Sequence, residues 1–264
     1  VWVRNFCNSL SHPLQLSQMF TKDDYQIVLK NEEMNKNHPK ISDEKIIIKK
    51  IIIVSDGYDF ESRHKIISEL PKDIGILVVN KAYQKWKLLS TELSIDKRRP
   101  INAFVINNPY ADCMNCLPSK DAKYYPTCVA SNRTNYEFLK KYKGQIYNYF
   151  PSRELKFGLD SKENYYIDDY RNPICASIGL AYKFDVKKLL LLCCDDSFKE
   201  KREYSIKMKN GMYTYPHHIK CHEIIDANLY WLSNQESKEV KIADFSSGPE
   251  YNNAINLKNI EDIY

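Results

Sequence analysis

The sequence predicts an α/β fold: a Rossmann-like, mostly parallel sheet with helices on both faces, preceded by a short helical arm. Runs that are apolar at every position, such as Ile51 to Val54 and Leu189 to Cys194, indicate strands buried on both faces. Helix-like segments alternate with these runs about every 25 residues, as right-handed βαβ units require. We therefore assign residues 1–45 to the arm and a linker, and 46–264 to the Rossmann-like domain.

The first half of the chain begins with the arm. Apolar residues recur at helical spacing over residues 1–30, and the polar stretch 31–45 indicates a linker. The elements expected next are a strand at 46–54, a helix at 62–70, a strand at 74–79, a helix at 82–93 and a strand at 101–106. Trp86, Leu89 and Leu93 form one apolar row of the second helix, which fits packing against a sheet.

The second half continues the same alternation after an irregular stretch. The expected elements are a strand at 127–131, a helix at 135–142, a strand at 146–150, a helix opening at 172–173, a strand at 189–194, a helix at 221–232 and a strand at 240–245. Pro173 suits a first helical turn, where its missing N–H is not needed. Residues 109–169 are otherwise rich in Tyr, Asn, Pro and Cys and irregular in pattern.

The composition limits the classes of partner. The formal net charge of +5 comes from 39 basic and 34 acidic residues spread along the chain, so we expect no specific nucleic acid partner and a mild preference for anionic ligands. No apolar run approaches the ~20 residues of a membrane-spanning helix, so no membrane partner is expected. Neither GxGxxG nor GxxxxGK[ST] is present, which excludes a glycine-rich phosphate loop.

The cysteines and the N-terminus indicate a compartment. Three of the eight cysteines fall in predicted buried segments, so we expect reduced thiols and a cytoplasmic protein. The N-terminus has neither a signal-peptide pattern nor an initiator Met. A homo-oligomer and a place within a larger polypeptide both stay open.

Polar residues follow four of the predicted strands. Asp56 with Gly57, Asn80, Asn108 and Asp195 each stand where an apolar run ends. The carboxyl ends of parallel strands meet at one edge of a sheet, where α/β proteins bind ligands. Although Asn, Asp and Gly are also common turn residues, four such ends together predict a ligand crevice.

Aspartates at these ends indicate a magnesium site. Asp56, Asp195 and Asp196 would hold Mg²⁺ against a polyphosphate, because magnesium binds through one or two carboxylates plus substrate oxygens. Asp195 and Asp196 are accordingly also assigned as catalytic. The alternative is that one of them caps a turn and the other is solvated.

A phosphate site is predicted where the strand at 127–131 meets the next helix. Ser131 offers a hydroxyl and Arg133 a guanidinium group beside backbone N–H groups, a combination suited to phosphate. A structural salt bridge made by Arg133 is the alternative.

Two further groups of residues can carry chemistry. Cys113 and Cys116 form a single CxxC motif, which without a second half is a weak zinc signal, so we do not expect zinc. His217, with His218 and His222 nearby, is the candidate general base or proton donor, the alternative being surface histidines that only form hydrogen bonds.

Three short segments resemble one family. Trp2-Val-Arg-Asn5-Phe-Cys-Asn8 is similar to the W-x-x-N-x-x-x-N opening of the MptE-like proteins, named for archaeal 6-hydroxymethylpterin diphosphokinase. Residues 172–198 are similar to the late helix and strand of that family, and Ser246-Ser247-Gly248 to its closing turn. Its relatives glycosylate flagellin, as motility accessory factors do, or resemble bacterial sialyltransferases.

The resemblance implies a nucleotide-dependent transferase. The expected reaction is magnesium-assisted diphosphate transfer from ATP to a small alcohol such as a pterin; the alternatives are glycosyl transfer from a nucleotide-sugar and a non-catalytic binding or structural module. Asn80 and Asn108 would orient the acceptor, and Gly57 and Asn172 would belong to the nucleotide site. Where the family has a Gly-Pro-Ser-Leu turn, this chain has residues 55–58, Ser-Asp-Gly-Tyr, which implies metal-dependent binding or lost activity.

Overall fold

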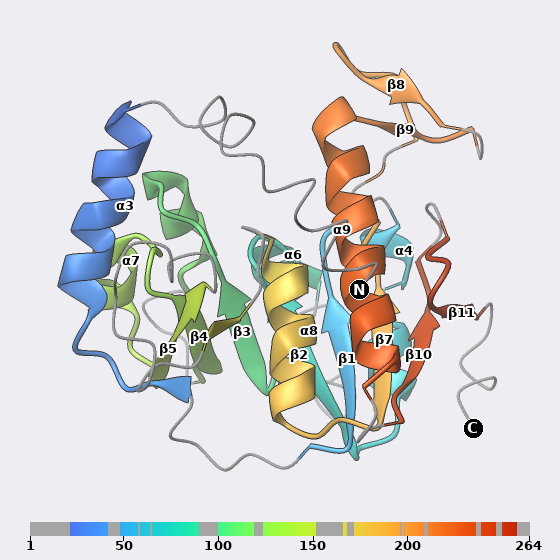
Figure 1. Ribbon diagram of the computed structural model, residues 1–264, viewed down its shortest axis with the longest axis horizontal. Helices are drawn as coiled ribbons and strands as arrows, with labels where there is room; N and C mark the ends of the chain where they lie inside the picture. Colours follow the sequence, from blue (N-terminus) through green and yellow to red (C-terminus); the bar gives the residue numbers. More distant parts are fainter. Residues whose placement is uncertain are drawn as a thin grey trace.

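The computed structural model describes most of the chain. The described residues are 22–41, 48–57, 59–63, 65–89, 100–118, 124–151, 166–167, 172–195, 197, 199–208, 211–235, 239–246 and 250–257. They form three layers, with a central sheet between two layers of helices (Figure 1). Within these ranges no helix is both long and apolar enough to cross a membrane.

The central sheet has nine strands in the described part of the chain, and neighbouring strands are parallel throughout. From edge to edge the strands are β11 (Ile255–Asn256), β10 (Lys241–Asp244), β7 (Lys188–Leu192), β1 (Lys50–Val54), β2 (Ile74–Val79), β3 (Ala103–Ile106), β4 (Thr127–Ser131), β5 (Ile146–Pro151) and β6 (Tyr166–Ile167). The short strands β8 (Ile206–Lys207) and β9 (Tyr213–Thr214) form a separate antiparallel pair. The predicted α/β fold with a mostly parallel sheet is confirmed.

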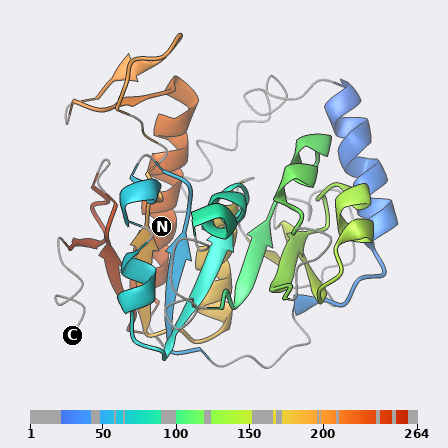
Figure 2. The ribbon, with the colours of Figure 1, turned by 180° about the vertical axis from the view of Figure 1, so that it is seen from behind.

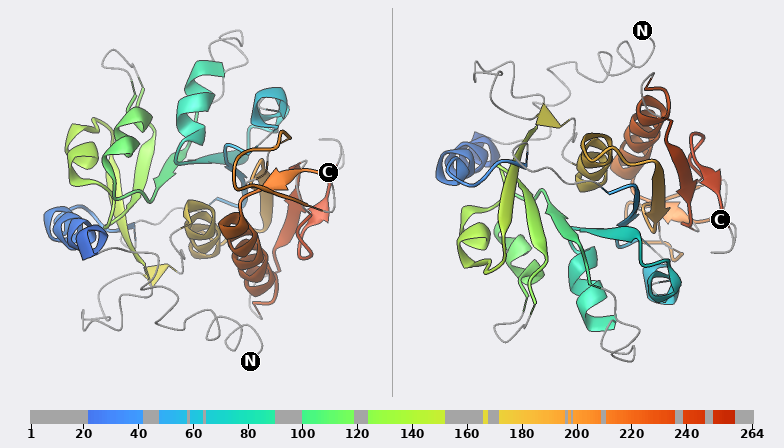
Figure 3. Two further views of the ribbon diagram at one scale, coloured as in Figure 1. Left: turned by 90° about the horizontal axis from the view of Figure 1, so that it is seen from above. Right: turned by 90° about the horizontal axis from the view of Figure 1, so that it is seen from below.

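Helices cover both faces of the sheet, as Figures 2 and 3 show from behind, above and below. One face carries α4 (Phe60–Arg63), α5 (Ile66–Glu69), α6 (Ala82–Leu89), the 3-10 helix η4 (Ala111–Cys116) and α7 (Tyr136–Lys141). The other carries α8 (Pro173–Lys183) and α9 (Pro216–Ser233). Alternate residues of β1 divide between the two layers: Ile51 and Ile53 pack with α8 and α9, and Ile52 and Val54 with the opposite helices. This two-sided burial is why the strands are apolar at every position.

The order of the strands reverses between β1 and β7. From β1 the chain adds β2 to β6 on one side, then returns to place β7, β10 and β11 on the other. The two loops that leave this point are joined by a hydrogen bond of 2.9 Å from the Gly57 N–H to the Cys193 carbonyl oxygen. Such a reversal opens a crevice at the carboxyl ends of the strands.

Helix α3 (Lys22–Asn35) corrects the expected linker at 31–45, because the helix continues to Asn35. It packs against α7 beside β4 and β5. After it, Lys40 bridges to Asn148 of β5, and Ile41 is fully buried in the core. The described part of the arm is therefore built onto the sheet. Residues 1–21 lie outside the described residues.

Other boundaries differ from expectation as well. The strand predicted at 189–194 ends at Leu192, because Cys193 turns the chain with a φ of 56°. The helix predicted at 221–232 begins at Pro216, so the expected loop around the histidines forms its first turn. The helix predicted at 62–70 is two short helices, α4 and α5.

Candidate ligand-binding cavity

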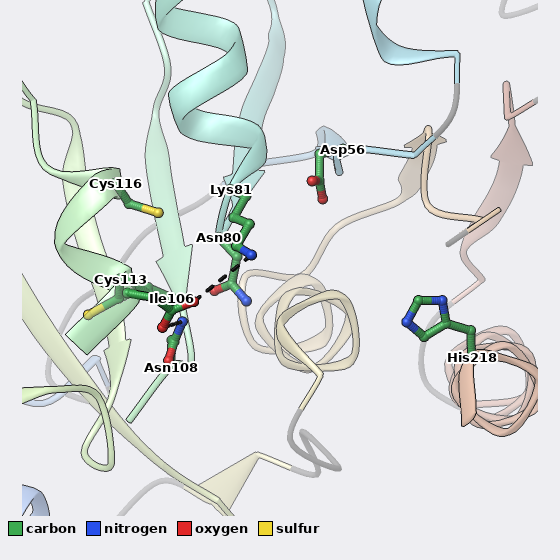
Figure 4. Close-up of a pocket in the computed structure, with 9 residues that line it drawn as sticks. Asp56, Asn80, Lys81, Ile106, Asn108, Cys113, Cys116 and His218 are labelled. Carbon is green, nitrogen blue, oxygen red and sulfur yellow. Dashed lines mark hydrogen bonds and ion pairs between the residues drawn. The ribbon is translucent and has the colours of Figure 1, made fainter. Parts of the chain in front are cut away.

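A cavity of about 380 Å³ lies at the carboxyl edge of the sheet. Its described lining residues are Asp56, Asn80, Lys81, Ile106, Asn108, Asp112, Cys113, Cys116 and His218. They come from the ends of β1, β2 and β3, from η4 and from the first turn of α9 (Figure 4). The cavity therefore lies where the polar strand ends were expected to meet.

Asp56, Asn80 and Asn108 are the predicted residues that the structure brings together. The Asp56 carboxylate lies 4.0 Å from the Lys85 ammonium group, which also donates a hydrogen bond of 3.2 Å to the Asp56 carbonyl oxygen. Asn80 has a φ of 39°, unusual for a residue other than glycine, and its Oδ1 accepts a hydrogen bond of 3.2 Å from the Asn107 N–H. Their predicted roles in binding stay predictions.

Asn108 is held by residues at the start of η4. Its Oδ1 accepts a hydrogen bond of 2.9 Å from the Tyr110 N–H, and its Nδ2 donates one of 3.0 Å to Asp112. Asp112 in turn lies 3.9 Å from the Lys81 ammonium group. Sequence reasoning missed Lys81 and Asp112. Lys81 directly follows Asn80 at the end of β2, which is the signal that would have found it.

Of the candidate histidines, His218 has its side chain at the cavity. It faces the other lining residues from α9 (Figure 4) and stacks edge-on against Tyr215, with ring centroids 5.5 Å apart. His222, one turn later, instead stacks on Tyr251 at a centroid distance of 4.2 Å. His217 lies in the first turn of α9, but its side chain is outside the described part of the structure.

Both cysteines of the CxxC motif line the cavity, although the Cys113 thiol points away from the other lining residues (Figure 4). Cys113 and Cys116 are buried in η4, and burial raises their pKa values to about 12 and about 11. Both thiols are therefore protonated near neutral pH and add no charge to the cavity. Among the described residues, no group of three or more His, Cys, Asp or Glu side chains is arranged to hold a metal.

Asp195 lies beside the cavity rather than among its described lining residues. It is buried, and its carboxylate accepts a hydrogen bond of 2.5 Å from the Ser197 hydroxyl. It packs directly on Gly57, where an added Cβ would lie 2.1 Å from Asp195 Oδ1. Asp196 lies outside the described residues, so the three-aspartate magnesium site stays a prediction. The described pair, Asp56 and Asp195, does not share the cavity.

Two further buried aspartates, Asp59 and Asp244, lie near Asp195. Asp59 is joined to Arg63 at 2.5 Å, and the Asp244 Oδ1 accepts a hydrogen bond of 2.9 Å from the Ser246 N–H. Burial raises the pKa of Asp244 to about 7, helped by the charges of Asp195 and Asp59 and opposed by the Ser246 hydrogen bonds. Sequence reasoning missed this group, because the strand was expected to continue to residue 245, whereas Asp244 is the last residue of β10.

The predicted phosphate site at Ser131 and Arg133 is a docking site for α3. The Arg133 guanidinium group donates a hydrogen bond of 3.0 Å to Glu32 of α3, so the alternative of a structural salt bridge is confirmed. The Asn35 amide donates hydrogen bonds of 2.9 and 2.7 Å to the carbonyl oxygens of the residues on either side of Arg133. Ser131 is fully buried and accepts a 3.3 Å hydrogen bond from the Arg133 N–H. Phosphate binding there stays a prediction.

Asn172 is the N-cap of α8. Its Oδ1 accepts a hydrogen bond of 2.8 Å from the Ile174 N–H, and Pro173 occupies the first turn as expected. Because α8 runs from here to the start of β7, its N-terminus lies at the carboxyl edge of the sheet. Asn172 therefore has a structural role, and its assignment to the nucleotide site stays a prediction.

Comparisons with known proteins support the fold. No protein-family model and no curated protein matches the sequence. Among solved structures the chain is similar to a MAf glycosyltransferase from Magnetospirillum magneticum AMB-1, with a TM-score of 0.64 and 13% sequence identity. The similarity covers 89% of this chain and 38% of that one, so this chain spans well under half of that protein's length. At this identity, the likeness shows a shared fold.

Proposed function

We propose that this protein is a transferase that binds a nucleotide-linked donor at the carboxyl edge of its sheet and transfers a sugar to an acceptor hydroxyl. The observation that carries the proposal is the cavity itself: strand ends with amide and charged groups on one side, and His218 on the other. A crevice of this kind is where open α/β sheets bind their ligands.

In the proposed step, the protein positions the donor and the acceptor and supplies one proton acceptor. The acceptor oxygen attacks the anomeric carbon of the sugar, and the bond from that carbon to the donor phosphate oxygen breaks. The nucleotide leaves with the electron pair, and the acceptor proton passes to the His218 imidazole. The glycosyltransferase named in the comparison supports this choice of transferred group.

Diphosphate transfer is the second candidate, and one observation favours it. Asp56 and Asp112 both line the cavity, and two carboxylates with phosphate oxygens are sufficient to hold Mg²⁺. When bound, the ion would neutralise phosphate charge, and the same strand-end amides would orient an acceptor alcohol. Binding of ATP that requires magnesium, with no binding of nucleotide-sugars, would favour this candidate.

Replacing His218 by asparagine tests the proposed proton acceptor. We expect turnover to fall about 100-fold, since a positioned general base contributes about that much or more. Turnover is measured as nucleotide release from a panel of UDP-, GDP- and CMP-sugars, with water as the acceptor. The matched control is His222→Asn, one turn along α9, which should stay within about twofold of the wild type because His222 stacks on Tyr251.

Two results would count against this account. Full turnover in the His218→Asn variant would remove His218 from the step. If the wild-type protein released nucleotide from none of the donors in the panel, that result would contradict glycosyl transfer itself.

A further inference from the structure

The strand-end side of the cavity is balanced in charge. We call this part, formed by Asn80, Lys81, Ile106, Asn108, Asp112, Cys113 and Cys116, the amide side. Its lysine, Lys81, lies 3.9 Å from Asp112, and the nearby Asp56 carboxylate lies 4.0 Å from Lys85. Without a bound cation, a phosphate group here would meet two carboxylates, and each lysine already lies within 4.0 Å of one of them. The amide side is therefore poorly suited to a phosphate.

Asn80 presents hydrogen-bond donors to this part of the cavity. Its Oδ1 is tied to the Asn107 N–H at 3.2 Å, which fixes which end of the amide faces outward. Its Nδ2 has no hydrogen-bond partner among the described residues, and the side chain lies beside Asn108 at the cavity (Figure 4). The φ of 39° lies in the left-handed region, which asparagine adopts more readily than most residues other than glycine.

The remaining wall of the amide side is uncharged. Ile106 is fully buried, and the raised pKa values of Cys113 and Cys116 keep both thiols protonated. These three residues therefore add no charge to the site, whose fixed polar groups are few, as is common in small-molecule sites. The combination fits a neutral ring that carries hydroxyl groups.

We propose that the amide side binds an uncharged, hydroxylated ring, either the acceptor or the sugar being transferred, and that Asn80 Nδ2 is the donor that selects it. The phosphates of the donor then bind elsewhere along the carboxyl edge. This inference rests on the proposed function, and the binding of a nucleotide-linked donor is tested by a separate experiment. A site built to hydrogen-bond a hydroxyl group discriminates strongly against ligands that lack it.

The test compares two variants of Asn80 with wild type by calorimetry. The Asn80→Asp change keeps an acceptor for the Asn107 N–H but replaces the donors with a carboxylate. The Asn80→Gly change removes the donors without adding charge, and glycine tolerates the positive φ. The probes are glucose, galactose and N-acetylglucosamine as neutral rings, and UMP, CMP and GMP as nucleotides.

We expect at least one neutral sugar to bind wild type and to bind each variant at least about tenfold more weakly. Nucleotide affinity should stay within about twofold in Asn80→Gly. The control is Asn102→Asp. The Oδ1 of Asn102 likewise accepts a backbone hydrogen bond, of 2.8 Å from the Ile76 N–H, but Asn102 lies at the amino edge of the sheet. This control should change neither affinity.

Four outcomes of this test distinguish failure of the inference from failure of the proposed function. No binding of neutral sugars by wild type, or sugar affinity unchanged in both variants, would overturn this inference. Loss of nucleotide affinity in Asn80→Gly would also overturn it, by placing the phosphates on the amide side. Sugar binding that depends on Asn80, with no nucleotide binding at all, would support the amide side and contradict the proposed function.

Discussion

Replacing Gly57 by alanine is expected to destabilise the folded protein by about 3 kcal/mol or more. The added Cβ would lie 2.1 Å from Asp195 Oδ1 and 2.5 Å from the Cys193 carbonyl oxygen. Relief requires backbone movement, because Cys193 is itself hydrogen-bonded to the Gly57 N–H at 2.9 Å. The change therefore separates the β1 and β7 loops at the point where the strand order reverses.

The free energy of unfolding is measured by urea denaturation, with Gly75→Ala as the control. Gly75 is also buried in a central strand, but its added Cβ would meet the side chain of Ile48 at 3.1 Å, which can shift. We expect that control to change stability by about 1 kcal/mol or less. Equal stability of Gly57→Ala and wild type would show that the two loops are not packed as described.

Replacing Asp244 by asparagine is expected to stabilise the protein by roughly 3 kcal/mol at pH 8 and by little at pH 4. The buried Asp244 carboxyl has a pKa of about 7, above the ordinary value of 3.8. The folded state thus holds a proton that the unfolded state releases at lower pH. This favours folding below pH 4, and the advantage is lost as the pH rises toward 7. In the wild type, the Ser246 N–H donates a hydrogen bond of 2.9 Å to Asp244 Oδ1, and the asparagine side chain keeps an oxygen that can accept it.

The measurement is urea denaturation of wild type and variant at intervals from pH 4 to pH 8. The control is Asp185→Asn, since hydrogen bonds from Lys49 and Lys187 lower the pKa of Asp185 to about 2, below the range tested. It should leave the slope of stability against pH unchanged. The same slope in Asp244→Asn and wild type would contradict the shifted pKa of Asp244.

Much of the fold could be predicted from the sequence, because burial on two faces leaves a plain pattern. The apolar runs ending at Val54 and Val79 indicated central strands, and both are fully covered in the structure. The apolar run at 189–194 extends two residues beyond the end of β7, because Cys193 and Cys194 are as buried as the strand before them. Apolar content alone does not locate the turn.

The site was predictable only where chain order fixes position. Asp56, Asn80 and Asn108 follow parallel strands, so they had to meet at one edge. The pairing of Arg133 with Glu32 depends on where α3 docks, which no local pattern encodes. The contact of 3.9 Å between Lys81 and Asp112 likewise depends on how η4 packs beside the end of β2, although the position of Lys81 directly after Asn80 was visible in the sequence.

The most direct test of the central claim is a thermal-shift screen of the wild-type protein. The ligands are ATP, CTP, GTP, CMP, UDP-sugars and CMP-sialic acid, each with and without magnesium. A ligand that binds only the folded state, at ~100 times its dissociation constant, adds about 2.7 kcal/mol to stability. We predict stabilisation by at least one nucleotide-sugar without magnesium. Stabilisation by ATP only with magnesium would shift the assignment to diphosphate transfer, and no stabilisation by any nucleotide would contradict a nucleotide-dependent transferase.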